Sequence, residues 1–167
     1  QISMGYANSS NRNSGIGVSM DDTTATEYLL NLASGGTDRV RVTGAGKVGI
    51  GTTAPDTLLH LKSSTSSEPI LIIENTNADA GGSMLKLMKS TTSEGDDDEL
   101  GNISFQGMDD GGNLTEYAFI RGISADVTGG TEDGTLSFFT RVNNSVAARL
   151  SIVDGNVGIG TTSPADL

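Results

Sequence analysis

VGIGTTAP, the octapeptide at residues 48–55, returns almost unchanged as VGIGTTSP at residues 157–164. The similarity extends upstream, because an alternating stretch and a glycine-containing turn precede each copy. Self-similarity of this kind indicates a repeated structural unit. We interpret the two octapeptides as connectors that end two related modules, and a glycine-rich hairpin that happens to occur twice is the simpler alternative.

Each connector alternates β-branched residues with glycine. A strand that has no side chains on one face lets another backbone approach closely, or lets the chain bend sharply. The proline that follows favours an extended exit from the connector. The residues expected to play this structural role are Val48, Gly49, Ile50, Gly51 and Pro55 in the first copy, and Val157, Gly158, Ile159, Gly160 and Pro164 in the second.

Composition indicates that one copy of the chain cannot build a dense core alone. Only 35% of the 167 residues are hydrophobic, 4% are aromatic, and 23 are glycine. Soluble globular domains usually contain about 45–50% apolar residues. Since the strand pattern is clear, we expect that other copies of the chain complete the core.

Charge and motif content exclude several classes of function. The net charge of −11 disfavours nucleic acid and anionic membrane surfaces as partners, because both require clustered Lys and Arg. No apolar run is long enough for membrane insertion, no signal peptide is visible, and cysteine is absent. We expect no cofactor.

Period-two alternation dominates the chain and predicts an all-β fold without helices, which by itself leaves a sandwich, a barrel and an interwoven fibre open. Glycine-rich and Asp/Asn-rich turn clusters separate the alternating segments. We place a module boundary after the first connector, which gives modules 1–56 and 57–167, and we expect the second module to be truncated within a longer polypeptide. The predicted strands are 15–20, 26–33, 38–43, 46–51, 57–62, 69–74, 83–89, 99–107, 114–124, 134–142, 147–153 and 156–160.

Candidate chemical sites are sparse, and each has a structural explanation beside the functional one. His60, the single histidine, alternates with leucines and is expected to face outward without a catalytic role. The acidic run 96–99 lacks the spaced ligand pattern of a calcium loop, and a hairpin turn explains Asp109-x-Gly111-x-Asn113. Tyr6 and Phe139 are the candidate glycan contacts, although a polar loop explains Tyr6 equally well and a buried strand is the favoured explanation for Phe139. We predict no metal site and no enzymatic activity.

The connectors and their flanks resemble the fibre-shaft modules of phage tail fibres and related trimeric surface fibres. The resemblance covers roughly residues 26–167, and such shafts are often followed by an endosialidase-type chaperone domain, which nothing in this chain resembles. It implies an elongated, interwoven, parallel homotrimer with β-prism or triple β-helix-like modules, located in a virion tail fibre or on an extracellular surface. The stretches that carry it are Arg39–Leu61, Glu99–Phe105, Tyr117–Gly122, Asp133–Phe138 and Arg149–Leu167.

The function expected from these features is structural and adhesive: a fibre segment that projects a receptor-binding tip and itself contacts host-surface glycan. A monomeric carbohydrate-binding β-sandwich is the alternative. A polysaccharide-degrading fibre domain is a third hypothesis, but the sequence gives no way to pair its carboxylates, such as Glu116 and Asp126.

Overall fold

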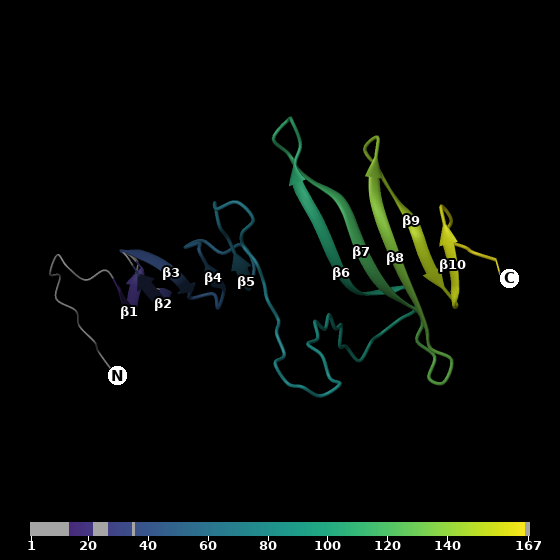
Figure 1. Cartoon of the computed structure of the whole chain (residues 1–167), viewed down its shortest axis with the longest axis horizontal. Helices are drawn as coiled ribbons and strands as arrows, with labels where there is room; N and C mark the ends of the chain where they lie inside the picture. The colour runs from purple at the N-terminus through teal and green to yellow at the C-terminus, as the bar shows by residue number, and fades with distance from the viewer. Residues whose placement is uncertain (1–13, 22–26, 35, 166–167) are drawn as a thin grey trace. The chain divides into compact units, whose positions relative to one another are not determined.

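Ten β-strands and no helix make up the regular structure of the residues that the computed structural model describes, which are 14–21, 27–34 and 36–165. The strands form two five-stranded sheets, one in each of two compact units, Gln1–Glu74 and Asn75–Leu167 (Figure 1). The all-β fold class predicted from alternation is therefore confirmed. Within the described ranges, no helix has the length and apolar character needed to cross a membrane.

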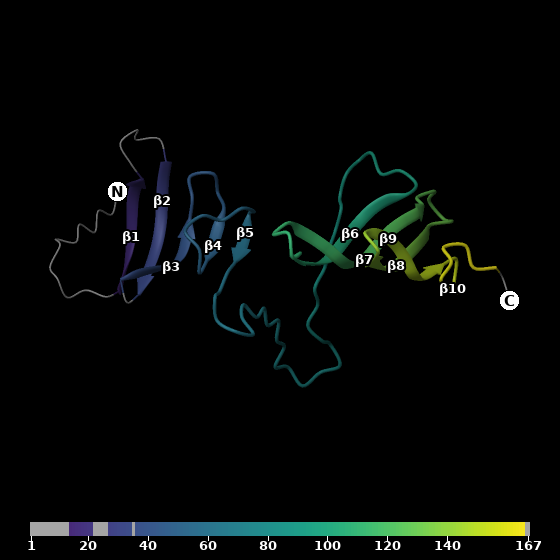
Figure 2. The same cartoon turned by 90° about the horizontal axis from the view of Figure 1, so that it is seen from above.

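The strands of the first unit lie side by side in chain order. They are β1 (Ser14–Asp21), β2 (Glu27–Ser34), β3 (Thr37–Val42), β4 (Val48–Ile50) and β5 (Leu59–Leu61). Neighbours are antiparallel, except that β5 joins β4 in parallel (Figure 2). Because side chains alternate between the faces of a strand, one face of this sheet carries the row Leu32, Val40, Ile50 and Leu61, and the other carries Asn31, Arg41, Gly49 and His60.

The second unit is an antiparallel meander of β6 (Asp98–Met108), β7 (Leu114–Asp126), β8 (Asp133–Val142), β9 (Ser145–Val153) and β10 (Asn156–Ile159). Shifts in register interrupt the ladders between β6 and β7, β7 and β8, and β8 and β9. The register gathers apolar side chains on one face, which we call the apolar face. It comprises Ile103, Phe105, Ile120, Leu136, Phe138, Leu150, Ile152, Val157 and Ile159.

The described part of the chain has almost no hydrophobic core of its own. Phe119 is the one hydrophobic residue there that is buried, with 8% of its surface exposed. Two other buried side chains are polar: the hydroxyls of Ser137 and Ser151 hydrogen-bond to each other at 3.0 Å. On the apolar face most side chains are open to solvent, up to 83% for Ile159. A one-layer sheet buries an apolar face only when a second layer covers it.

Two of the predicted strands, 69–74 and 83–89, are wrong. Both ranges lie in the long connection between β5 and β6, and neither joins a ladder (Figure 1). The hydrophobic side chains in both ranges are exposed. Alternating apolar and polar residues indicate that a segment suits a half-buried extended backbone. A strand also requires a neighbouring strand edge with which it can pair. The other ten predicted ranges each coincide with one of the ten strands, with ends shifted by a few residues.

The boundary between the compact units falls after Glu74, whereas the connector motif placed a module boundary after residue 56. The difference arises because the chain does not leave the first sheet at the connector. It continues into β5, which pairs with β4 through Val48↔Leu59 and Ile50↔Leu61.

The hairpin between β6 and β7 explains the Asp109-x-Gly111-x-Asn113 sequence as a turn. The Asp109 Oδ1 atom accepts a hydrogen bond from the backbone N–H of Asn113 at 2.8 Å, and both carboxylate oxygens accept from the Asn113 side chain. The backbone N–H of Asp109 in turn donates to the Asn113 carbonyl at 2.9 Å. These donors, the backbone N–H of Asn113 first among them, lower the pKa of Asp109 below the ordinary value of an aspartate.

We predict that the hairpin tip loosens in acid. A group whose pKa is lowered by folding stabilises the structure above its unfolded pKa, and this contribution is lost as the pH falls through the folded pKa, here below about 4. Titration of the Asp109 carboxyl by NMR should give a pKa below that of the unfolded chain. In an Asp109→Asn variant the tip amides should lose this pH response. A carboxyl that titrates at or above the ordinary aspartate value would contradict the prediction.

Candidate functional site

The two connectors have the same local structure, so the repeated octapeptide is a repeated piece of architecture. Each begins in the second strand of a hairpin, β3–β4 in the first unit and β9–β10 in the second. The N–H of Gly51 donates to the Arg39 carbonyl at 3.0 Å, and the N–H of Gly160 donates to the Arg149 carbonyl at 2.9 Å. One residue later, a threonine Oγ1 accepts a backbone N–H: Thr52 from Ala54 at 3.3 Å, and Thr161 from Ser163 at 3.2 Å.

The first glycine of each connector is where the chain folds back against its own strand. A Cβ atom at Gly158 would lie 2.6 Å from the Thr161 carbonyl oxygen, and one at Gly49 would collide with the carbonyl oxygen of Thr52 in the same way. Both glycines are buried. The bare face of the strand thus accommodates a backbone carbonyl three residues further along the chain, which only a residue without Cβ permits.

The second glycine of each connector has a left-handed backbone, with φ of 75° at Gly51 and 74° at Gly160. Other L-residues adopt this conformation at a cost of about 1–2 kcal/mol. Gly51 also lies against the carbonyl oxygen of Lys62, at the end of the parallel strand β5, whereas a Cβ at Gly160 would meet no described atom within 4 Å. The two positions share their backbone conformation and differ in this one contact.

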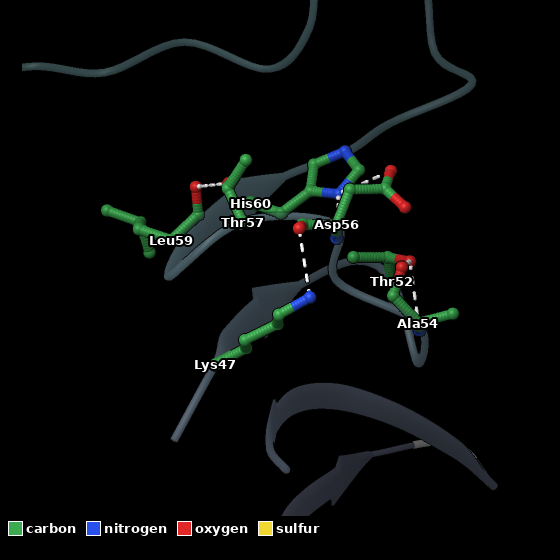
Figure 3. Close-up of polar contacts among 7 residues, drawn as sticks. All are labelled: Lys47, Thr52, Ala54, Asp56, Thr57, Leu59 and His60. Atoms are coloured by element: carbon green, nitrogen blue, oxygen red, sulfur yellow. Dashed lines mark hydrogen bonds and ion pairs between the residues drawn. The ribbon is translucent and has the colours of Figure 1, made fainter. Parts of the chain in front are cut away.

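The exit from the first connector is held by polar contacts that Figure 3 shows together. The Lys47 ammonium donates to the Asp56 carbonyl at 2.9 Å, and Thr57 Oγ1 donates to the Leu59 carbonyl at 2.8 Å. The His60 imidazole lies beside Asp56, with Nδ1 3.5 Å from Oδ2 and 3.4 Å from the Asp56 backbone nitrogen. Pro55, which directly precedes Asp56, is buried. His60 is therefore positioned to hold the bend that leads into β5, on the same face of the sheet as Gly49.

Of the two candidate glycan contacts, the structure describes only Phe139. Tyr6 lies outside the described residues. Phe139 stacks on Phe119 across β7 and β8, with ring centroids 4.2 Å apart, and the Arg121 guanidinium lies 4.7 Å from the Phe139 centroid. Phe138 points to the apolar face, as expected for neighbours on a strand. The aromatic pair with its arginine is a half-buried platform on the opposite face, and sequence reasoning missed the contribution of Arg121.

The acidic loop is occupied by structural contacts. The Asp98 carboxylate lies 2.6 Å from the Lys89 ammonium and accepts a hydrogen bond from the Gly95 N–H at 2.9 Å. Lys89 and then this N–H lower the pKa of Asp98. Asp96 accepts from the N–H of Val127 at 3.0 Å. Among the residues described by the structure, no three acidic or histidine side chains are grouped as a metal site would require.

A cleft of about 610 Å³ lies where the first connector meets the chain that leaves β5. It combines the cations of Arg39 and Lys62 with Glu68, which accepts a hydrogen bond from Ser63 at 2.9 Å, and with the apolar side chains of Ile50 and Ile70. Sequence reasoning did not find it. The charged residues flank the connector motif, but only the parallel pairing of β5 brings them to one place.

We predict that the first glycines cannot be replaced even by alanine. Gly49→Ala and Gly158→Ala should each lower the free energy of unfolding by about 1–3 kcal/mol, because the added methyl meets a backbone carbonyl that cannot move away cheaply. Gly129→Ala is the matched control: its Cβ would meet nothing within 4 Å, and its effect should stay within about 0.5 kcal/mol. Denaturant unfolding measures both. Equal effects at the three positions would disprove the close approach.

A second comparison isolates the contact with β5. Gly51→Ala and Gly160→Ala introduce the same backbone strain, so any excess loss at residue 51 reports the collision with the Lys62 carbonyl. We expect Gly160→Ala to lower stability by about 1–2 kcal/mol and Gly51→Ala by clearly more. Thermal melting of the two variants is sufficient. An equal loss in both would mean that β5 does not hold its parallel position.

A scan against protein-family models gave no match, and a search of curated proteins gave none either. Function must therefore be inferred from the connectors and from the sheet faces that they position.

Proposed function

We propose that this chain is a structural and adhesive segment of a phage-like tail fibre or surface fibre, in which three parallel copies assemble and cover one another's apolar faces. The observation that carries the proposal is the apolar face of the second sheet, which a single copy leaves open. A fibre segment of this kind would belong to a virion tail fibre or an extracellular surface. The proposed function includes no catalytic step.

The amount of exposed surface supports self-association. On the apolar face, Ile103, Phe105, Leu136, Phe138, Ile152, Val157 and Ile159 each expose 36–83% of their surface. Each large apolar side chain that another copy covers would contribute about 1.5–3 kcal/mol. Covering this face would therefore stabilise an assembly of several copies.

The first unit repeats this arrangement on a smaller scale. Leu30, Leu32, Ile50 and Leu59 share one face of its sheet and are all exposed. In each unit the connector ends the last hairpin of the sheet in a bend that is held by the same backbone and threonine hydrogen bonds. Three one-sided sheets around a common axis would supply each other's second layer, and the assignment of three copies rests on the resemblance of the connectors to fibre-shaft modules.

A monomeric carbohydrate-binding module is the second candidate. The half-buried Phe139, which stacks on the buried Phe119 and lies beside Arg121, favours it, since an aromatic surface beside a cation suits a sugar ring that carries a carboxylate. In the fibre proposal the same platform remains on the face away from the assembly, where host-surface glycan would reach it. The two candidates therefore differ in the number of copies rather than in this surface.

Mass measurement separates the candidates. Light scattering on a sizing column should give three times 17.1 kDa, about 51 kDa. A cooperative unfolding transition at that mass would place the apolar faces inside the assembly. A monomer that melts cooperatively would contradict the fibre proposal and support the carbohydrate-binding module.

A substitution on the apolar face should dissociate the assembly. Ile152→Asn places a polar amide where the proposal requires burial, and we expect it to lower the stability of the assembly by about 2–4 kcal/mol per copy. Ser104→Asn, on the opposite face of the same sheet, is the control and should leave the mass unchanged. Sedimentation at several concentrations measures both. Dissociation by the control alone, or by neither variant, would contradict the proposal.

A further inference from the structure

A strip of the long connection already lies on the apolar face of its own sheet. Leu87 sits above Gly101, where a Cβ would come within 2.7 Å of the Leu87 Cβ. The Lys89–Asp98 ion pair fixes the next residues beside β6. Together Leu87 and the sheet enclose a hollow of about 200 Å³, lined by Leu100, Ile103, Ile120 and Leu136. Leu87 therefore anchors the strip, residues 84–88, on the end of the apolar face that belongs to β6 and β7.

The outer side of the strip is apolar as well. Met84 is 72% exposed and Met88 is 71% exposed, while Leu87 is less so at 48%. Residues 84–88 form no strand, and the exposure of Met84 and Met88 shows that the sheet of their own unit leaves them uncovered. The sheet of its own copy covers only one side of the strip.

The far end of the apolar face is equally uncovered. β10 is the edge strand of the sheet at the side away from β6, and its Val157 and Ile159 are among the most exposed apolar residues of this face. The strip is anchored at β6, so one copy presents two different apolar patches. One is the outer side of the strip, and the other is the β9–β10 end of the face.

We propose that the outer side of the strip, Met84 and Met88, packs onto the β9–β10 end of the apolar face in a second copy of this chain. The contact joins two different patches, so it is head-to-tail, and such contacts close into a ring when the rotation between copies permits. Methionine suits this position because its flexible, polarisable side chain fills irregular apolar gaps. This inference rests on the self-association in the proposed function and names the surfaces that carry it.

The chain contains no cysteine, which allows a direct test. A chain carrying only Met88→Cys and a size-tagged chain carrying only Val157→Cys are unfolded, mixed, refolded and mildly oxidised. Any disulfide between them then joins two copies. We expect this mixed disulfide on a non-reducing gel, in severalfold excess over the product of Met88→Cys with Ser104→Cys, a control on the opposite face. Met84→Cys with Ile159→Cys is a second pair, for the case in which one variant fails to fold.

The outcomes separate this inference from the proposed function. A mixed disulfide within a particle of about 51 kDa supports both. A particle of that mass that forms no mixed disulfide in either pair, or as much with the control, overturns the head-to-tail contact and leaves the fibre proposal standing. Preferential disulfides between two chains that both carry Met88→Cys would indicate a self-complementary contact and also overturn it. A monomer that forms no disulfide would overturn both.

Discussion

A sheet with one apolar face is stable only when a second layer covers that face, and the described part of this chain covers little of it. The described residues bury one hydrophobic side chain, Phe119, while the row from Ile103 to Ile159 stays open. Burial of apolar surface is the dominant stabilising contribution to folding. The low apolar content of the sequence is therefore consistent with an open apolar face. The proposed assembly would supply the missing cover for that face.

The other face of the second sheet is built by different means. Near β10, small and polar residues fill it: Ser137 and Ser151 share a buried hydrogen bond, and the connector carbonyl of Thr161 lies against Gly158. Buried hydroxyls stabilise a structure only when they are paired, and here each satisfies the other. The chain itself therefore closes this part of the face, whereas Tyr117 and Phe139 nearer β6 keep exposed surface.

Most of the strands could be predicted from the sequence, because alternation such as Leu136/Phe138 directly reflects a backbone with two unlike faces. The close approach behind the connector glycines was also predictable, since Val-Gly-Ile-Gly leaves one face bare. The failures have a common cause. Residues 69–74 and 83–89 have the strand pattern without a pairing partner, and the stack of Arg121 on Phe119 and Phe139 depends on a cross-strand register that no local pattern specifies. Local sequence predicts which side chains are suited to burial, but it does not identify the surface that will cover them.

The parallel pairing of β5 with β4 determines the direction in which the chain travels. A tight hairpin would return the polypeptide toward its starting point, whereas this connector releases it along the direction of the strand it has just completed. In the proposed fibre, a module added after such a connector would begin from the end of its parallel strand, as the chain does after β5. Gene duplication or deletion of one module would then adjust the reach of the protein in steps, with the same glycine–threonine bend at every joint.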